Sequence, residues 1–494
     1  MRRIPCTPRP NATRLVQSQG LVYTTDPPQP TTKDEVTDPY WPDNRYYTFT
    51  TTEISLLSQA ATEVFTLCCE AADYLLAHPH LITSRLAIPA FALQQIASSW
   101  NREPAWGSVY GRFDVCFGGL DHPDERLRTP RFYEFNADTP TSLVEAASVQ
   151  WLWLEQTGLG RDQWNEVAEK LVGAWRRNLR EVEREKGFCG GDDRGEDGVD
   201  EGEGKKKKMT VHFAIARDEP TGEDAMNTLL LLDTCQQAGW PTKAIFMDEI
   251  ARSEEDGRFY DLDGDHIDVI FKLYPWEFMM EEEFARDCFL DMAREDGTGT
   301  VWIEPPYKML WSNKGLFAIL WELFKDDPRG KWLLPTYFED DETKNKLAGG
   351  LTKYARKPIF AREGADVTLH ADGKILQDST TGLYGKEGYI IQELALLPEF
   401  LDPRTNTPHY PVLGLWMVDG EVAGLGIRED KTPITTNGSN FIPHSIEDGE
   451  VNYERKEVPS KEEIEAVLTV ERCVNVTERE GEVLSYIGRL TRGV

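Results

Sequence analysis

Polar side chains recur at alternate positions in two short segments of the sequence. Arg112-Phe-Asp114 and Glu134-Phe-Asn136 each hold a phenylalanine between two polar residues. Because successive side chains of a strand point to opposite faces, the polar residues of each segment share one face and the phenylalanines point into the core. Pairing the two strands gives a patch of one Asp, one Glu and one Asn beside an Arg.

This patch contains the ligand types that Mg²⁺ prefers. Two carboxylates and an amide oxygen suit a hard cation that leaves places for phosphate and water. The patch lacks His and Cys, which disfavours zinc. The alternative is an ordinary hairpin with an exposed polar face, and the patterning alone does not separate the two.

The residues after the second segment predict a turn that faces an anion. From Glu134 to Ala147 the sequence reads EFNADTPTSLVEAA, in which a strand ends in a hydroxyl-rich turn and a helix opens. Such a turn presents hydroxyl groups and helix N-terminal amides to an anionic ligand.

This run is part of a series of motifs that resembles the synthetase domain of the glutathionylspermidine synthase family, which are ATP-grasp carboxylate–amine ligases. The series covers roughly residues 35–445 and is closest to stand-alone members without the amidase domain, since nothing matches that domain's Cys–His hydrolase. Besides the segments above, its motifs are QWLWLE (150–155), FKLYPWE (271–277), IEPPYK (303–308), SNK (312–314), LLP (333–335), YARKP (354–358), REGAD (362–366), PVLGLW (411–416) and GIRED (426–430).

The resemblance implies roles for the polar patch. Asp114, Glu134 and Asn136 match the Mg²⁺ ligands of the family, where two ions neutralise the ATP phosphates. Arg112 matches an arginine that contacts the transferred phosphoryl group and the acyl substrate, and a guanidinium fork suits such an oxyanion.

The resemblance also implies an ATP site. Lys314 and Lys357 match two phosphate-binding lysines, although either alone would be read as a solvated surface residue. Arg362 and Gly364 belong to the glycine loop that closes over the phosphates. Gln392, Glu393 and Leu394 match the strand that binds adenine through its backbone. The sequence pattern alone predicts only a buried strand at these residues.

Substrate contacts follow in the same way. Arg428 matches an arginine on a mobile segment that reaches the reacting centre; its alternative is an ion pair with Glu429, Asp430 or another acid nearby. The loop that grips the carboxylate substrate is matched by Asp138, Thr139, Thr141 and Ser142.

The amine site departs from the polyamine-using members. They place two adjacent acids after the strand matched by residues 211–216; here Glu223 and Asp224 are present, but Gly222 stands where the first acid would be. Asn437 and Asn440 stand where the family has a lysine and a polyamine-binding acid. Because a polyamine needs paired charges, we expect a different or less cationic amine, such as an amino acid or small peptide, with spermidine as the alternative.

The expected function is therefore ATP-dependent ligation of a small-molecule carboxylate and an amine, through an acyl phosphate, with ADP as product. Two alternatives are a nucleotide-binding protein without turnover and a phosphoryl or adenylyl transferase acting on another acceptor. The side chains would mainly position the reactants, screen phosphate charge and exclude water.

The elements that must position these residues indicate an α/β (α+β) fold, with parallel and antiparallel sheets flanked by helices. Helices are predicted at 53–77, 143–154, 163–185, 224–238, 280–293 and 459–470, the last with Ser460 and Glu463 as a capping box. Strands are predicted at 112–116, 131–136, 211–216, 242–247 and 269–274, of which the last three alternate with helices as in a parallel sheet. Residues 351–442 are expected to be strand-rich.

In most ATP-grasp domains the metal ligands follow the phosphate-binding lysines in the sequence. Here they precede them, and the resemblance implies that the domain is circularly permuted. The resemblance and composition predict an irregular N-terminal arm (1–45), a metal- and acyl-binding part (46–186), a disordered charged insertion (187–209), an α/β substrate-binding subdomain (210–300), a nucleotide-binding part (301–445) and a charged tail with one helix (446–494).

Composition excludes several classes of function. The 494 residues carry 54 Lys and Arg against 85 Asp and Glu, a net charge of −31, whereas nucleic-acid binding needs an excess of cations. No run approaches eighteen apolar residues, so no membrane span is expected. The eight scattered cysteines indicate free thiols and a cytoplasmic location; a mitochondrial presequence is the alternative, disfavoured by prolines near the N-terminus. The sequence does not decide the oligomeric state.

Overall fold

A central antiparallel sheet carries both polar segments in the computed structural model, which describes residues 1–23, 39–102, 107–188, 209–219, 221–340 and 351–469. In spatial order its strands are β19 (Asn440–Phe441), β18 (Glu421–Asp430), β17 (Pro408–Val418), β3 (Tyr110–Cys116) and β4 (Arg131–Asn136), with β16 (Phe400–Leu401) paired to β17. The sheet thus joins strands from the first third of the chain to strands near its end.

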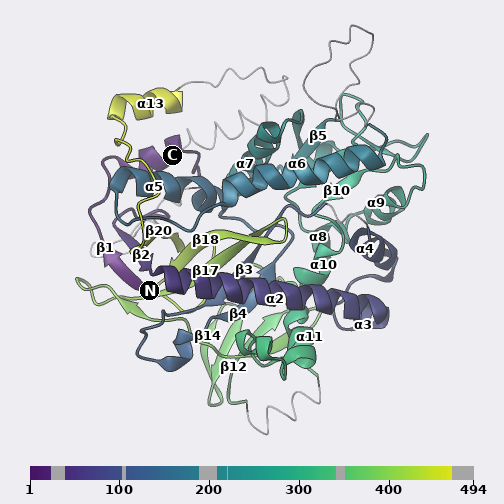
Figure 1. The fold of residues 1–494 in the computed structure, drawn as a ribbon. Helices are drawn as coiled ribbons and strands as arrows, with labels where there is room; N and C mark the ends of the chain where they lie inside the picture. The colour runs from purple at the N-terminus through teal and green to yellow at the C-terminus, as the bar shows by residue number, and fades with distance from the viewer. Residues whose placement is uncertain (24–38, 103–106, 189–208, 220, 341–350, 470–494) are drawn as a thin grey trace.

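The two faces of the central sheet are covered differently. Phe113, Leu413 and Ile427 alternate onto one face and pack in a core with α2 (Thr51–Ala77). On the opposite face Trp416 joins a second core with α6 (Val167–Glu185). Figure 1 shows α2 crossing in front of β17 and β3, with α5 and α6 on the other side of the sheet. The predicted alternation of core and polar residues is therefore confirmed.

A parallel sheet confirms the predicted alternation of strands and helices. Its spatial order is β10 (Val301–Ile303), β9 (Val269–Lys272), β5 (Val211–Ile215) and β6 (Thr242–Phe246), and all neighbours run parallel. The crossover after β5 is α7 (Glu223–Ala238). The helix predicted at 280–293 is shorter and forms α9 (Ala285–Met292), after the single turn α8 (Trp276–Met279).

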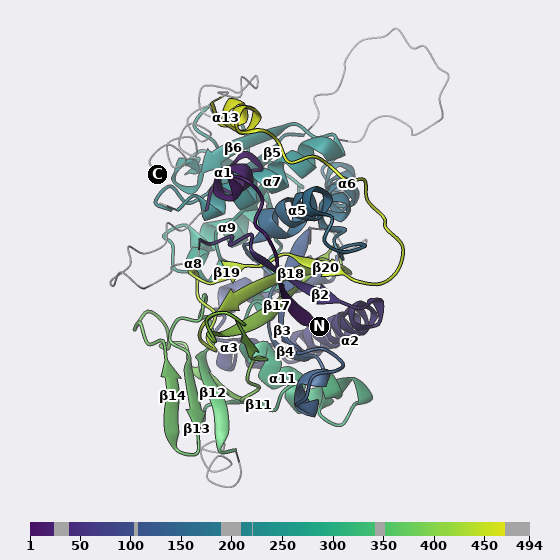
Figure 2. The same cartoon turned by 90° about the vertical axis from the view of Figure 1, so that its left-hand side faces the viewer.

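A flanking antiparallel sheet accounts for much of the strand-rich region after residue 351. Its order is β11 (Thr336–Phe338), β15 (Tyr389–Glu393), β12 (Lys353–Pro358), β13 (Thr368–Ala371) and β14 (Lys374–Asp378). In Figure 2 this sheet lies at the bottom, the central sheet in the middle, and the parallel sheet with α6 and α7 at the top. The fold class, α/β with parallel and antiparallel sheets flanked by helices, is confirmed.

The described part of the N-terminal segment differs from the irregular arm predicted at 1–45, of which residues 24–38 lie outside the described residues. It forms β1 (Arg2–Pro5) and α1 (Ala12–Ser18), and β1 pairs with β2 (Arg45–Phe49), which in turn pairs with β20 (His444–Ile446). Arg3 also forms a buried ion pair with Glu429, at 2.8 Å. Long-range pairing of this kind orders a proline-rich segment whose local pattern shows no periodicity.

The charged tail contains the helix that its capping box predicts. α13 spans Lys461–Thr469; the Ser460 amide donates to the Glu463 carboxylate at 2.7 Å and the Glu463 amide to the Ser460 hydroxyl at 3.2 Å. The helix packs on α1, where Arg14 pairs with Glu465 at 3.0 Å. The charged insertion predicted at 187–209 lies almost wholly outside the described residues.

Short elements complete the architecture. The remaining helices and strands are α3 (Pro79–Ser84), α4 (Leu93–Trp100), α5 (Gln150–Thr157), α10 (Lys308–Trp311), α11 (Gly315–Phe324), the π-helical turn η3 (Glu145–Val149), the 3₁₀ turns η1 (Ala90–Ala92), η2 (Glu125–Arg128), η4 (Met247–Glu249) and η5 (Pro328–Trp332), and the ribbon of β7 (Ala251–Arg252) with β8 (Phe259–Tyr260). Across the described ranges, no helix has both the length and the apolar character needed to cross a bilayer.

Candidate active site

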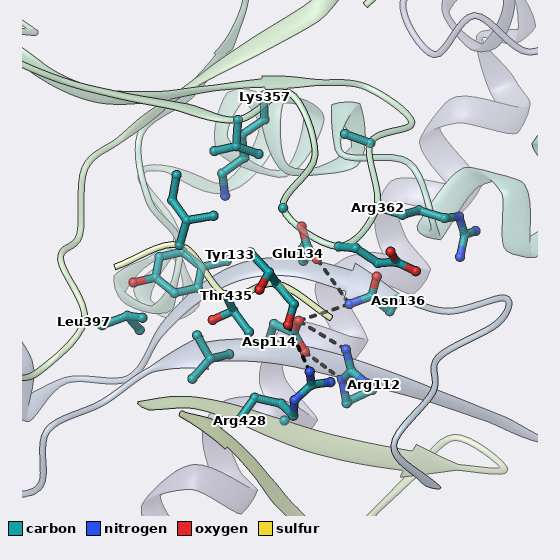
Figure 3. A pocket seen from close by; sticks show the side chains of 18 of the residues that line it. Arg112, Asp114, Tyr133, Glu134, Asn136, Lys357, Arg362, Leu397, Arg428 and Thr435 are labelled. Atoms are coloured by element: carbon teal, nitrogen blue, oxygen red, sulfur yellow. Dashed lines mark hydrogen bonds and ion pairs between the residues drawn. The ribbon is translucent and has the colours of Figure 1, made fainter. Parts of the chain in front are cut away.

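A large cleft opens between the central sheet and the flanking sheet, and most of the predicted site residues line it. Its empty volume is about 1500 Å³ with the space open to solvent included. Figure 3 shows Arg112, Asp114, Glu134, Asn136, Lys357 and Arg428 pointing into this space. The charged residues of the lining are Arg112, Asp114, Glu134, Lys314, Lys357, Arg362, Glu363, Glu393 and Arg428.

Arg112 is held in place by three groups. Its Nε donates to Asp114 Oδ1 at 2.8 Å, and its Nη1 donates to the Thr141 carbonyl oxygen at 2.6 Å. The guanidinium also lies over the Trp416 ring, 5.7 Å from its centre. The neighbouring residue Gly414 leaves room for this arginine, because a Cβ atom there would lie 2.7 Å from Arg112 Cδ. Sequence analysis missed Gly414, whose only signal is its place in the PVLGLW motif.

The three predicted metal ligands form one contiguous group. Asp114 stands opposite Glu134 in the β3–β4 register, and Arg112 stands opposite Asn136. The Asn136 side-chain nitrogen lies 3.2 Å from Asp114 Oδ2 and 3.2 Å from Glu134 Oε1, so it bridges the two carboxylates. This all-oxygen set, with the amide oxygen of Asn136, fits Mg²⁺. Among the residues that the structure describes, His, Cys, Asp and Glu form no cluster of three or more that could hold a metal.

The two predicted phosphate-binding lysines lie beside this group. Lys314 Nζ pairs with Glu134 Oε2 at 2.7 Å and donates to the Ala361 carbonyl oxygen at 2.6 Å. Lys357 Nζ donates to Gln392 Oε1 at 2.8 Å. Both are buried rather than solvated, which excludes the surface-lysine alternative.

Electrostatic coupling within this group shifts the pKa values. Burial lowers the pKa of Lys357 to about 8, with Lys314 adding to the effect and Glu134 opposing it. Burial alone would raise the pKa of Glu134, but Lys314 and Lys357 outweigh it and hold the pKa at about 2. Glu134 is therefore ionised at every physiological pH, as a metal ligand must be.

The predicted glycine loop closes one side of the cleft. Gly364 has φ +70°, and a Cβ atom there would lie 2.5 Å from the Thr435 carbonyl oxygen. Arg362 lines the cleft, but its Nε donates to Glu277 at 2.6 Å and its Nη1 to the Thr139 hydroxyl at 2.7 Å. In this conformation Arg362 connects the glycine loop to the substrate loop through Thr139, and its guanidinium is not available to bind phosphate.

The predicted adenine strand contributes to an apolar wall. The amides of Glu393 and Leu394 donate to the carbonyl oxygens of Pro335 (2.7 Å) and Lys353 (3.1 Å), so these two donors are already used within the flanking sheet. The apolar residues of the wall are Ala355, Val367, Leu369, Leu394, Leu396, Leu397, Val412 and Ile434.

Arg428 faces the cleft and not the neighbouring acids. Its Nη1 donates to the Ser142 hydroxyl at 3.0 Å, and its other donors reach the carbonyl oxygens of Thr436, Asn437 and Ser439 at 3.0–3.2 Å. Glu429 points to the opposite face and bonds to the side chains of Arg3, Arg45 and Tyr47. The alternative of an ion pair between Arg428 and Glu429 or Asp430 is wrong in this structure.

The substrate loop is only partly as predicted. Thr139, Thr141 and Ser142 line the cleft. Asp138 does not: it is fully buried, bound to Lys272 Nζ at 3.2 Å and the Trp276 amide at 2.8 Å. Its carboxylate serves to fix the loop on the parallel sheet.

Asn440 is also turned away from the cleft. Its amide oxygen accepts a hydrogen bond from Arg45 at 3.1 Å and its amide nitrogen donates to the Pro39 carbonyl at 2.8 Å. The prediction that Asn440 contacts substrate therefore differs from the structure, in which this residue anchors the N-terminal segment.

The two predicted amine-site acids open α7 behind the substrate loop. Burial raises the pKa of Asp224 to about 8, and Glu219, Glu223 and Glu363 raise it further, with Arg362 opposing them. Burial also raises the pKa of Glu223, and Arg428 opposes this shift. The N-terminus of α7 stabilises the acids in its first turn, Glu223 and Asp224. Capping of the helix does not explain why Glu219 and Glu363 lie close enough to raise the pKa of Asp224.

Comparison with known proteins finds relatives that match most of the chain. The family model described as "Glutathionylspermidine synthase preATP-grasp" matches residues 3–447. A Haemophilus influenzae protein named "Putative acid--amine ligase" is 34% identical over 414 residues, which cover 82% of this chain and 90% of that protein.

Two further relatives are longer than this chain. "Trypanothione synthetase" of Crithidia fasciculata is 26% identical, over 72% of this chain and 49% of its own length. "Bifunctional glutathionylspermidine synthetase/amidase" of Escherichia coli is 24% identical, over 82% of this chain and 59% of its own length. The match thus spans between half and three fifths of these two proteins. The family model covers residues 3–447, and the Haemophilus influenzae protein is 34% identical over 90% of its length. The chain therefore belongs to the glutathionylspermidine synthase family, whose members are acid–amine ligases.

Proposed function

We propose that the protein joins a small-molecule carboxylate to an amine, with ATP cleaved to ADP and phosphate through an acyl phosphate. One observation carries this proposal. Arg112, Lys314, Lys357, Arg362 and Arg428 converge on one cleft in a chain of net charge −31. A cluster of positively charged side chains in a strongly negative protein favours the binding of a polyanionic ligand in the cleft.

The nucleotide takes the side of the cleft beneath the flanking sheet. Adenine packs against the apolar wall, and Lys314 and Lys357 contact the phosphates, where an ammonium neutralises charge as the γ-phosphoryl group leaves. Asp114, Glu134 and Asn136 would hold Mg²⁺, which would screen phosphate charge. Lys314, now paired with Glu134 at 2.7 Å, would turn to the phosphates, and Glu134 would then be free to hold the metal.

The carboxylate substrate lies between the two cleft arginines. Arg112 and Arg428 both contact the substrate loop, through the Thr141 carbonyl and the Ser142 hydroxyl. Guanidinium groups placed on either side of the reacting carbonyl stabilise the negative charge that develops on it. Thr139 and Thr141 orient the carboxylate in this scheme.

The amine approaches from the side of Glu223 and Asp224. Glu219 and Glu363 interact electrostatically with these two acids. The amine site therefore has four carboxyl groups, whereas the sequence predicted only Glu223 and Asp224. This excess supports an amine that carries positive charge when it binds, either as one ammonium, as in an amino acid or peptide, or as several, as in a polyamine.

The test is product analysis with purified protein. We expect ADP and phosphate from ATP and Mg²⁺ only when a carboxylate and an amine are both present, drawn from pools that include glutathione, amino acids, spermidine and other polyamines. Formation of AMP would contradict the acyl-phosphate route and favour adenylyl transfer. If no carboxylate in the pool stimulates ADP release, the chain is instead a nucleotide-binding protein.

A further inference from the structure

We propose that Ser142, Tyr40 and Glu145 form a proton relay that receives the proton lost by the attacking amine. The inference rests on the proposed ligase function and assigns a task to two residues outside the cleft lining. Ser142 is the member that lines the cleft, next to Arg428. Tyr40 and Glu145 lie behind it and are fully buried.

The hydrogen bonds of this group have one direction. The Tyr40 hydroxyl lies 2.6 Å from Glu145 Oε1 and 3.4 Å from the Ser142 hydroxyl oxygen. An ionised carboxylate only accepts hydrogen bonds, so the tyrosine must donate its proton to Glu145. With its proton given to Glu145, Tyr40 can only accept in its contact with Ser142, so Ser142 is the donor of that hydrogen bond, and the Ser142 oxygen accepts from Arg428 Nη1 at 3.0 Å.

The order of donors has a consequence for the cleft. Each hydroxyl proton points inward, from Ser142 to Tyr40 and from Tyr40 to Glu145. Ser142 therefore offers a lone pair to a ligand rather than a proton, and its partner in the cleft must be a hydrogen-bond donor. Among the proposed reactants, the amine nitrogen is that donor. The distance of 3.4 Å between the Ser142 and Tyr40 oxygens is long for a hydrogen bond, and catalytic hydrogen bonds often shorten only when substrate binds.

Glu145 is suited to end the relay. Its Oε2 atom is buried and has no hydrogen-bond partner within the described residues. Burial raises the pKa of Glu145 to about 7; the Tyr40 hydrogen bond and Arg428 oppose the shift, and Glu223 adds to it. The titratable and charged groups that face Glu145 are Tyr23, Tyr40, Glu223 and Arg428. A carboxyl group in this setting can accept a proton near neutral pH.

The backbone around the relay is unusual at two points. Ser142 has φ +67°, a left-handed conformation that costs energy for a residue other than glycine. Glu145 opens the π-helical turn η3, a feature that occurs often at functional sites. Both deviations occur at residues whose side chains contact the Tyr40 hydroxyl.

The amine reaches the cleft as an ammonium ion and must lose one proton before it can attack. The ammonium nitrogen gives that proton to the Ser142 oxygen, the Ser142 proton passes to the Tyr40 oxygen, and the Tyr40 proton passes to Glu145 Oε1. The free amine then forms a bond to the acyl carbon while the bond between the acyl carbon and the phosphate oxygen breaks. Phosphate leaves with that electron pair and takes the second proton from the nitrogen. Glu145 afterwards releases its proton along the same relay to solvent.

A purely structural role for Glu145 and Tyr40 predicts a different outcome. If the pair only anchored Arg428, its loss would slow attack by every nucleophile to the same extent. The relay acts only on a nucleophile that arrives protonated and must lose a proton before it attacks. A nucleophile that arrives as the free base needs no such step and gives one proton only, to the departing phosphate. Hydroxylamine is largely unprotonated near neutral pH, whereas spermidine and amino acids are protonated, so the two kinds of nucleophile separate these roles.

The experiment compares Glu145→Gln and Tyr40→Phe with the wild type, using ATP, Mg²⁺, glutathione and either spermidine, glycine or hydroxylamine. We expect ADP formation with the protonated amines to fall by about 100-fold or more, and hydroxamate formation with hydroxylamine to change little. The defect with amines should shrink as the pH is raised. Tyr46→Phe and Glu249→Gln, a tyrosine and a buried glutamate outside the cleft, serve as controls and should match the wild type.

Equal losses with hydroxylamine and with amines, unchanged by pH, would overturn the relay and leave the ligase proposal standing. A wild-type protein that forms no ADP with any nucleophile overturns both. Tyr40→Phe keeps the ring and the buried charge, so it decides the question if Glu145→Gln does not fold.

Discussion

Gly414→Ala is the substitution that tests most directly how Arg112 is positioned. A Cβ atom at residue 414 would lie 2.7 Å from Arg112 Cδ and 3.3 Å from its Cγ. Carbon atoms in contact are normally about 3.5–4.0 Å apart, so the arginine must shift by roughly 1 Å. Its bonds to Asp114 (2.8 Å) and to the Thr141 carbonyl (2.6 Å) would then be stretched beyond hydrogen-bonding distance.

A displacement of about 1 Å at a reacting centre costs on the order of 100-fold in rate. We therefore expect kcat for ADP formation to fall by about that factor, with a loss of stability of about 1–3 kcal/mol from overpacking. The assay is steady-state ADP release alongside thermal unfolding. In the matched control, Gly173→Ala, the new methyl group meets nothing within 4 Å on α6, so activity should be unchanged and the helix about 1 kcal/mol more stable. Wild-type kinetics for Gly414→Ala would refute the claim that Arg112 acts from this position.

Three further predictions address the metal, the phosphate site and the N-terminal segment. Asp114→Asn should raise the Mg²⁺ concentration needed for half-maximal ADP release by more than the roughly 10–100-fold typical of second-shell partners, with unfolding unchanged; an unaltered Mg²⁺ titration would contradict the metal assignment. Because the pKa of Lys357 is lowered to about 8, chiefly by burial, its charge is lost as the pH rises through 8, so kcat/KM for ATP should fall there, and Lys357→Arg should remove that fall. Burial would raise the pKa of Glu429, but the neighbouring histidine and two arginines outweigh it and lower the pKa well below its ordinary value. Its contribution to stability is thus present above pH 4.5 and lost on acidification, and Glu429→Gln should cost about 3–5 kcal/mol near neutral pH, measured by urea unfolding; a cost under about 1 kcal/mol would contradict the buried network.

Local patterns in the sequence predicted those parts of the fold that depend on neighbouring residues. The alternation of Arg112-Phe-Asp114 and Glu134-Phe-Asn136 is enough to define two strands with a polar face, because side-chain direction follows the backbone. The capping box of Ser460 and Glu463 likewise specifies where α13 begins.

Contacts between distant parts of the chain could not be predicted in this way. Tyr40 reaches Glu145 across 105 positions and Arg3 reaches Glu429 across 426, and no periodicity links such pairs. Family resemblance drew attention to Asp138 and Asn440 but did not predict their side-chain directions. Those are set by Lys272 and Arg45, to which each is bonded.

The central claim, that a carboxylate is activated by phosphorylation, is tested most directly by following oxygen. A carboxylate from the active pool is labelled with ¹⁸O in its carboxyl group and incubated with the protein, ATP, Mg²⁺ and the amine. The account predicts that the released inorganic phosphate carries one ¹⁸O atom derived from the carboxylate, with ADP as the nucleotide product. Unlabelled phosphate, or label that appears in AMP, would contradict it.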